Sequence, residues 1–342
     1  MCGMIYDEPI FFEKNRVFRI YTGGRLLGEF VGDGSPDSSY PEEWIASDVK
    51  AQKSREHGEK EGVSRVRGTQ WYLDDLLRKY PREILGEKKE LGVLVKFLDS
   101  SIRLAAQAHP DSSYAQKYFG STHGKEESWV VLAKRPGGCV YFGFQEGVTR
   151  AQFAAAIARS AEDKHVMETL LVRHEVEPGD VIFVPARTVH AIGAGCLMLE
   201  VQEPTDFTIE PEHWCGDFRL TEEEMYLGLD QETALDCFDF TVSREVKLAP
   251  AVLEARPGLL AESLIGPRQT RNFGVNRITL SGGAFVPRRD AGIYVVTGGT
   301  GEITGSGCSQ PLRQGMYFLL PHAAADKFTL SGSMTVMECF AE

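Results

Sequence analysis

The chain has 342 residues, 42% of them hydrophobic and 25% charged, which is ordinary for a globular protein with a sizeable core. Its length predicts one large domain or two modest ones. The net charge of −12 argues against binding to nucleic acid or to an anionic membrane, because both require a basic surface. No apolar run reaches the roughly 18 residues of a transmembrane helix and no signal-peptide pattern occurs, so we expect a cytoplasmic protein.

The seven cysteines are odd in number and form no Cys-x-x-Cys pair. A disulfide framework or a zinc site built from thiolates is therefore not expected. Most of the cysteines are predicted to be small buried hydrophobic residues.

The first third of the chain predicts few helices. Residues 1–65 resemble strands and turns, whereas the apolar residues of Trp71–Tyr80 suit a short helix that ends before Pro81. Leu91–Leu98 is a short apolar run and predicts a buried strand. It contains Lys96, and because an unpaired buried lysine is costly, we expect this side chain to face a polar pocket.

The middle of the chain predicts strands with two helical segments between them. Glu127–Phe144 has two apolar runs around a Pro-Gly-Gly sequence, which indicates a β-hairpin. A helical segment is expected near 149–170, with a second helix at Val166–Val172, and another helical segment is expected near 218–238. Each segment begins at a capping-box pair, Thr149 with Gln152 and Thr221 with Glu224. Further strands are predicted at Val181–Val184 and Leu197–Val201.

From Phe240 onward, short apolar runs and many glycines indicate a β-sandwich or barrel. Gly179–His190 (GDVIFVPARTVH) and Gly315–Asp326 (GMYFLLPHAAAD) share a glycine, four apolar residues and a proline at matching positions. This repeat predicts two β-barrels related by duplication.

The predicted fold is therefore dominated by β-structure, with two barrels and a small helical insertion. The first domain covers 1–239 and the second covers 240–342. Asp326 of the second domain matches His190 of the first. Any metal site at this position is therefore expected in the first domain alone.

Potential metal ligands occur at three places in the first domain. Gln107 and His109 stand at i and i+2, so on a strand they point to the same face. Glu127 lies at the start of an apolar strand, and His190 lies at the end of the strand that contains GDVIFVP. These donors suit a divalent metal such as zinc, with a position left for water or substrate. Each piece alone is weak, since a lone histidine after a strand is more often structural, but their joint order favours a site.

The order Gln-x-His-Pro, Glu and Gly-Asp-x4-Pro-x4-His resembles the cupin metal-binding signature, with glutamine in place of the first histidine. More narrowly, most of the chain resembles class I mannose-6-phosphate isomerases of the short bacterial type, which have double-stranded β-helix (jelly-roll) barrels. The matching motifs are RIYTGG (Arg19–Gly24), PEEWIAS (Pro41–Ser47), LVKFLDSSIRLAAQAHPDSSYA, GKEESW (Gly124–Trp129), EPGDVIFVPARTVHAIGAGCLMLEVQ (Glu177–Gln202) and GMYFLLPHAAADKFTL.

This resemblance implies two active-site lysines, Lys96 and Lys125. Two departures from the family pattern concern the substrate. The family's active-site arginine matches Glu210, and a serine that contacts phosphate in the family matches Ala105. Both changes remove groups that would assist the binding or reaction of a phosphorylated sugar, and they leave the metal site intact. The resemblance also implies one zinc ion per chain, with ligands matching Gln107, His109, Glu127 and His190.

The resemblance predicts a zinc-dependent aldose–ketose isomerase, most simply one that interconverts mannose 6-phosphate and fructose 6-phosphate through a cis-enediol. Lys125 and Arg187 are candidates to bind phosphate. Glu210 is a candidate base, and an ordinary surface glutamate fits the same position equally well. One alternative is a metal-dependent cupin isomerase that acts on a different, unphosphorylated sugar; another is a non-catalytic cupin that binds a sugar. The expected partner is a small sugar or sugar phosphate, and the oligomeric state is not predicted.

Overall fold

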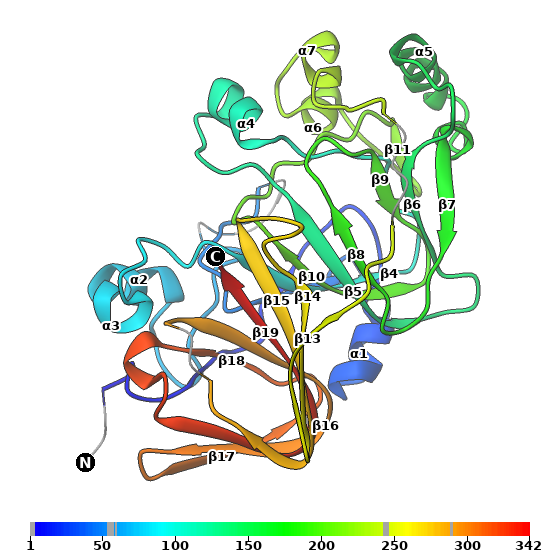
Figure 1. The fold of residues 1–342 in the computed structure, drawn as a ribbon. Coiled ribbons are helices and arrows are strands. Elements are labelled where there is room, and N and C mark those ends of the chain that lie inside the picture. Colours follow the sequence, from blue (N-terminus) through cyan, green and yellow to red (C-terminus); the bar gives the residue numbers. More distant parts are fainter. Residues whose placement is uncertain (1–3, 53–57, 59, 242–245, 288–289) are drawn as a thin grey trace.

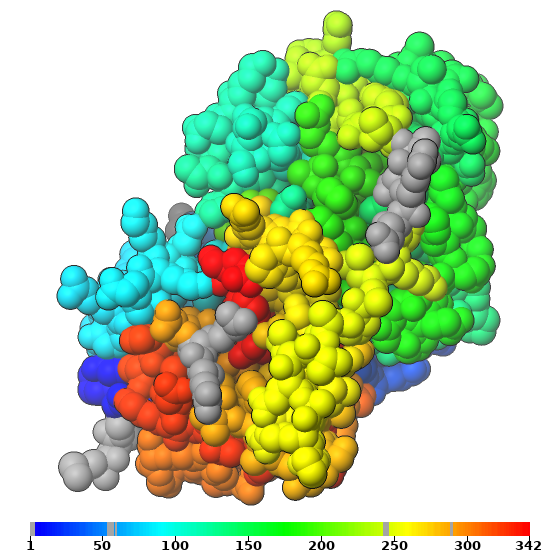
Figure 2. Space-filling model, viewed as in Figure 1, coloured from blue at the N-terminus to red at the C-terminus, as the bar shows by residue number. Residues whose placement is uncertain are grey.

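The structure, a computed structural model, describes residues 4–52, 58, 60–241, 246–287 and 290–342. It contains two cupin-type β-barrels, and most of the helices lie around the first of them (Figure 1). This arrangement confirms the predicted fold class. Figure 2 shows the two halves of the chain packed against one another.

The larger wall of the first barrel is an antiparallel sheet in the order β2-β3-β4-β10-β5-β8. Side chains alternate between the two faces of a strand. In β4, Val95 and Phe97 therefore enter a core that also contains residues of the second barrel, whereas Lys96 lines a pocket inside the first barrel. The strands are β2 (Arg16–Val17), β3 (Glu42–Ile45), β4 (Leu94–Ser100), β5 (Glu127–Lys134), β8 (Val181–Val184) and β10 (Cys196–Gln202).

The smaller wall is an antiparallel sheet in the order β7-β6-β9, formed by β6 (Cys139–Phe144), β7 (Leu171–Glu175) and β9 (His190–Ile192). The predicted hairpin over Glu127–Phe144 is therefore wrong. Both of its strands exist, but β5 pairs with β10 and β8, whereas β6 pairs with β7 and β9. The Pro-Gly-Gly turn carries the chain from one wall of the barrel to the other. A short pair follows, β11 (Trp214–Cys215) with β12 (Phe218–Arg219).

Several helices begin where the sequence predicts. Capping boxes form at Thr149 and Thr221, with both reciprocal hydrogen bonds present. The predicted helix at Val166–Val172 is wrong. This segment forms the 3₁₀ turn η1 (Met167–Leu170), and Leu171 already belongs to β7. The helices are α1 (Arg25–Val31), α2 (Leu73–Lys79), α3 (Pro81–Leu85), α4 (Ser112–Phe119), α5 (Arg150–Ser160), α6 (Glu222–Tyr226) and α7 (Gln231–Leu235).

Helix α1 lies where only strands and turns were predicted, because its seven residues are too short to show a clear helical period. It ends at Gly32, which has a left-handed backbone (φ 74°). Helix α4 begins at Asp111, whose carboxylate accepts a hydrogen bond from the Tyr114 amide. Within the described ranges, no helix is long and apolar enough to cross a membrane.

The second barrel is an antiparallel sheet in the order β1-β18-β16-β19-β15-β14-β13, with β17 paired to β16. The N-terminal strand β1 thus joins the C-terminal barrel through β18. In the two related segments, β8 and β18 both follow a glycine turn and end before a proline, as the repeat predicts. The elements are β1 (Ile10–Phe11), β13 (Ala251–Arg256), β14 (Leu259–Ile265), β15 (Phe273–Phe285), β16 (Gly292–Gly305), β17 (Cys308–Arg313), β18 (Tyr317–Leu320), η2 (His322–Ala324) and β19 (Phe328–Ala341).

The cysteines behave mainly as hydrophobic residues. Cys2 lies outside the described residues, and Cys308 is half-buried. All six cysteines in the described part of the chain are free thiols. The buried ones are Cys139, Cys196, Cys215, Cys237 and Cys339.

Candidate metal centre

The predicted metal ligands converge inside the first barrel. Glu127 is the first residue of β5, as expected. His190 begins β9 and does not end β8, which corrects its predicted place. Gln107 lies on an extended segment that pairs with His190: the amide of each residue donates to the carbonyl oxygen of the other, at 2.9 Å in both cases. This exchange fixes the segment that carries Gln107 and His109 against the start of β9.

Three ligand atoms face one another at the convergence. His109 Nε2 lies 3.0 Å from Glu127 Oε2, and His190 Nε2 lies 3.2 Å from Glu127 Oε1. One potential ligand atom from each of the three residues falls within 4.8 Å of the others. The three side chains are at most 2% exposed, so the group is shielded from bulk solvent.

The hydrogen bonds of the two imidazoles fix which nitrogen can act as a ligand. His109 Nδ1 lies 2.9 Å from the Phe207 carbonyl oxygen, and His190 Nδ1 lies 2.8 Å from the Thr188 carbonyl oxygen. A carbonyl oxygen only accepts, so each Nδ1 carries the proton and each Nε2 presents its lone pair. Burial, reinforced by the Lys125 charge, lowers the pKa of His109 to about 3, which keeps this ring neutral.

This arrangement fits a bound cation. The two Nε2 atoms and the carboxylate face one another in a buried site, and Lys125 donates to His109 and Glu127 but not to His190. His190 Nε2 is moreover buried without a hydrogen-bond partner. Two imidazole nitrogens and one carboxylate are a donor set that suits divalent zinc. The residues present therefore fit the implied metal.

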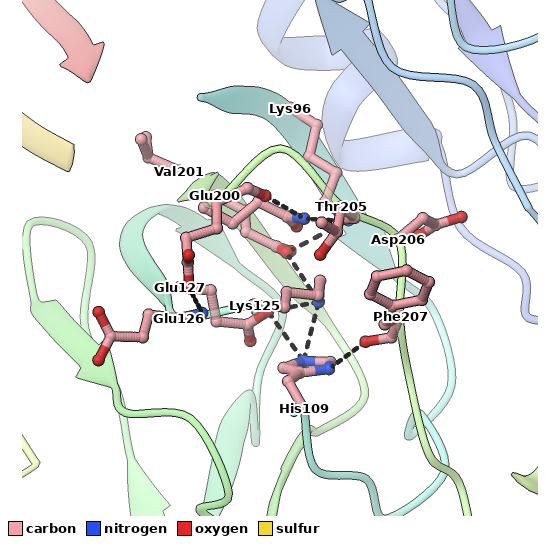
Figure 3. A network of polar contacts seen from close by, with 12 residues as sticks. Lys96, His109, Lys125, Glu126, Glu127, Glu200, Val201, Thr205, Asp206 and Phe207 are labelled. Carbon is pink, nitrogen blue, oxygen red and sulfur yellow. Dashed lines mark hydrogen bonds and ion pairs between the residues drawn. The ribbon is translucent and has the colours of Figure 1, made fainter. Parts of the chain in front are cut away.

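Lys125 supplies positive charge beside this group. Its Nζ lies 2.6 Å from Glu127 Oε2 and 2.8 Å from His109 Nε2, and its side chain is 4% exposed (Figure 3). The Lys125 charge outweighs the effect of burial and holds the pKa of the Glu127 carboxyl well below its usual range. The carboxylate is therefore ionised and ready to bind a cation.

A second ionic group lies next to the first in the same pocket. Lys96 Nζ lies 3.2 Å from Glu200 Oε1 and 3.8 Å from Glu42 Oε2. Burial raises the pKa of Glu200 to about 7, although Lys96 opposes this shift. Lys96 thus faces a polar pocket, as its place in an apolar run indicates. The polar wall of the pocket includes Arg19, Lys96, Lys125, Gln107, Glu127, Glu200, Asp206 and Glu210.

Glu42 is a functional-site residue that the sequence analysis missed. Its carboxylate accepts hydrogen bonds from Tyr21 (2.5 Å) and Trp44 Nε1 (2.6 Å), and Arg19 Nε lies 3.0 Å away. The signal was present in the motifs RIYTGG and PEEWIAS, which contain these four residues. Arg19 also reaches Asp206, at 3.3 Å, and so ties the N-terminal strands to the segment after β10.

We expect Glu42→Gln to lower the free energy of unfolding by about 2 kcal/mol at pH 7, because it weakens hydrogen bonds to charged partners. Arg19 and Lys96 outweigh burial and hold the pKa of the Glu42 carboxyl well below its usual range. A depressed carboxyl pKa stabilises the fold above the unfolded pKa, and this stabilisation is lost as the pH falls through the folded value. Urea unfolding should therefore show a smaller difference between the two proteins at pH 3.5 than at pH 7. An equal difference at both pH values would contradict this ionic role.

The remaining predicted residues fall in different places. Glu210 lines the pocket with Gln107 and Glu127. Arg187 does not line it: its guanidinium contacts the Asp236 carbonyl oxygen at 3.0 Å and lies 3.6 Å from Asp111. Ala105 is buried in the core of the first barrel.

A scan against models of known protein families finds no match. Two curated relatives nevertheless align with nearly the whole chain. Mannose-6-phosphate isomerase of Streptococcus mutans is 29% identical over 92% of this chain and 93% of its own length. Mannose-6-phosphate isomerase ManA of Bacillus subtilis is 29% identical over 95% of this chain and 96% of its own length.

The chain is a homologue of the mannose-6-phosphate isomerases. Solved structures of proteins with this name share its fold. The enzyme from Bacillus subtilis superposes with a TM-score of 0.78 at 24% identity, over 97% of this chain and 99% of that chain. A zinc-bound mannose 6-phosphate isomerase superposes with a TM-score of 0.75 at 15% identity, over 98% of this chain and 99% of that chain. The resemblance stated from the sequence motifs is confirmed.

Proposed function

We propose that this chain is a zinc-dependent aldose–ketose isomerase that interconverts mannose 6-phosphate and fructose 6-phosphate. The observation that carries the proposal is the buried group in which His109 Nε2, His190 Nε2 and the Glu127 carboxylate face one another beside a pocket. The homologues named mannose-6-phosphate isomerase support the choice of reaction and substrate. They favour it over the two alternatives, an isomerase of another sugar and a non-catalytic sugar-binding cupin.

In this proposal one zinc ion is held by His109, Glu127 and His190, with Gln107 as the fourth ligand. When bound, zinc polarises a substrate carbonyl and makes the proton on the neighbouring carbon more acidic. Lys125 lies against the Glu127 carboxylate and adds fixed positive charge where negative charge develops on the substrate oxygens. We assign Lys96 a supporting role: its ammonium holds Glu200 at 3.2 Å and keeps a second cation at the pocket wall.

An isomerase also needs a group that carries the proton between two neighbouring carbons. We propose Glu210, because this residue lines the same pocket as Gln107 and Glu127. The other carboxyl groups that line the pocket, apart from Glu127, are Glu42, Glu200 and Asp206. Glu200 forms an ion pair with Lys96, and Glu42 and Asp206 form ion pairs with Arg19. We also place the protein in the cytoplasm, where a sugar phosphate is available to it.

If Glu210 carries the proton, Glu210→Gln should lower kcat by about a hundredfold, within the usual range for general acid–base groups. The amide is nearly the same size, so zinc content and KM should change little. Steady-state kinetics and metal analysis of the variant, beside Glu223→Gln on the exposed face of α6, check this expectation. Full activity of Glu210→Gln would show that Glu210 does not carry the proton.

Proton transfer through an enediol predicts exchange with solvent. When zinc-loaded protein converts mannose 6-phosphate in D₂O, we expect deuterium at C1 of the fructose 6-phosphate formed, which NMR detects. Conversion without any deuterium would contradict a base that exchanges its proton with solvent. Absence of conversion, with zinc bound, would instead favour another sugar or a binding role.

A further inference from the structure

The turn that carries Lys125 is fastened firmly from within the first barrel. The Lys125 amide donates to the Pro110 carbonyl oxygen at 2.9 Å. The buried Glu203 carboxylate accepts from the amides of Gly124 at 3.3 Å and of Glu126 at 2.9 Å. A Cβ at Gly124 would come within 2.5 Å of the Pro110 oxygen, so only glycine allows this close approach.

The same turn is also fastened from the second barrel. One oxygen of the Glu126 side chain, Oε2, accepts hydrogen bonds from Thr270 Oγ1 at 2.5 Å and from Asn272 Nδ2 at 2.9 Å. Thr270 and Asn272 lie in the connection between β14 and β15 of the second barrel. Thr270 is 6% exposed, and its hydroxyl oxygen also accepts from the Asn272 amide at 3.0 Å. Of the two donors, Thr270 is buried and Asn272 is exposed, so the buried part of the contact is the hydrogen bond from Thr270.

Glu126 stands between the two residues that the pocket uses. Side chains alternate in an extended segment, so Lys125 and Glu127 point to one side and Glu126 to the other. Figure 3 shows this alternation: Lys125 and Glu127 approach His109, while the Glu126 carboxylate points away from it. Because Glu126 is bonded to both residues, a displacement of its backbone also displaces Lys125 and Glu127 in the pocket.

We propose that the second barrel positions Lys125 and Glu127 by holding the Glu126 carboxylate through Thr270 and Asn272. Glu126 is thus a positioning residue, and the second barrel, which offers no metal ligands among its described residues, completes the site of the first. This inference rests on the proposed zinc-dependent isomerisation for its kinetic consequence. The expected change in zinc affinity depends only on Glu127 being a metal ligand and not on the reaction.

The loss of partners that orient metal ligands typically costs about 10- to 100-fold in metal affinity or activity. Because Glu126 acts on the ligand Glu127 through the backbone, we expect the lower end of this range. Glu126→Ala and Thr270→Val should each lower kcat about tenfold and weaken zinc binding about tenfold, with KM nearly unchanged.

Two further variants separate positioning from a general loss of stability. Glu126→Gln should retain most of kcat, because its amide oxygen can take the place of Oε2 and accept from both Thr270 and Asn272. Gln314→Ala removes another contact between the barrels, the 3.0 Å hydrogen bond to the Phe30 carbonyl oxygen, at a distance from the pocket. It should lower the melting temperature without changing kcat or zinc affinity.

The experiment measures zinc affinity by competition with a chelator, together with kcat, KM and melting temperature, for the wild type and the four variants. The proposal predicts weakened zinc binding and kcat for Glu126→Ala and Thr270→Val, rescue in Glu126→Gln, and a change in stability alone for Gln314→Ala. It is overturned if Glu126→Ala and Thr270→Val lose only stability, as Gln314→Ala does. If the wild type shows no isomerisation, the proposed function fails, and the zinc affinities still decide whether Glu126 positions the site.

Discussion

Replacing His190 by alanine is expected to abolish stoichiometric zinc binding and to lower isomerase turnover by about 10³-fold, because the Lewis acid contributes several kcal/mol to the barrier. His190 Nε2 is buried and has no hydrogen-bond partner, so its lone pair has no structural use apart from a ligand. His109→Ala should behave in the same way. Metal analysis after dialysis and steady-state kinetics measure both effects.

The fold should survive these changes, since the His190 ring makes one hydrogen bond, to the Thr188 carbonyl oxygen, and the His109 ring makes two, to the Phe207 carbonyl oxygen and to Lys125. Circular dichroism and a cooperative melting transition check this point. His174→Ala is the matched control, because this half-buried histidine on β7 lies outside the metal group. Wild-type zinc content in both His109→Ala and His190→Ala would show that the ligand assignment is wrong.

Replacing Lys125 by methionine is expected to lower kcat by about 10²- to 10³-fold while zinc remains bound, as is typical when a preorganised charge is removed from a buried site. Methionine fills a similar volume but cannot donate to Glu127 or His109, which Lys125 now contacts at 2.6 and 2.8 Å. The metal ligands themselves are unchanged. Kinetics and zinc content therefore separate a loss of charge from a loss of metal.

Lys134→Met provides the control for this prediction. Lys134 ends the same strand, β5, but its Nζ contacts Glu177 at the surface, at 2.7 Å. Its replacement should leave kcat unchanged within about twofold, as is usual for surface residues away from special features. Equal losses in the two variants would mean that Lys125 acts through the strand and not through its charge.

The sequence predicts the parts of this fold that leave a strong local pattern. The apolar run that contains Lys96 forms β4, and the capping boxes at Thr149 and Thr221 begin α5 and α6. The spacing of Gln107 and His109, with Glu127 and His190, correctly identified residues that meet in space. These patterns reflect neighbours along the chain or the known order of a family motif.

Features that depend on distant contacts were missed. The turn between β5 and β6 has the composition of a hairpin, yet the strands pair with other partners, because each wall of the barrel is completed by strands from later in the chain. Arg187 is close to His190 in sequence, but the turn between them directs its side chain towards Asp111 and Asp236. Glu42 became part of the site only because β3 pairs with β4 and places it near Lys96.

The most direct test of the central claim is a coupled assay for fructose 6-phosphate formed from mannose 6-phosphate, on zinc-loaded and chelator-treated protein. We predict turnover by the zinc-loaded protein, its loss after chelation and its recovery when zinc is restored. Absence of turnover in protein that demonstrably holds one zinc ion per chain would contradict the proposed reaction. Equal turnover before and after chelation would contradict the role of the His109, Glu127 and His190 group.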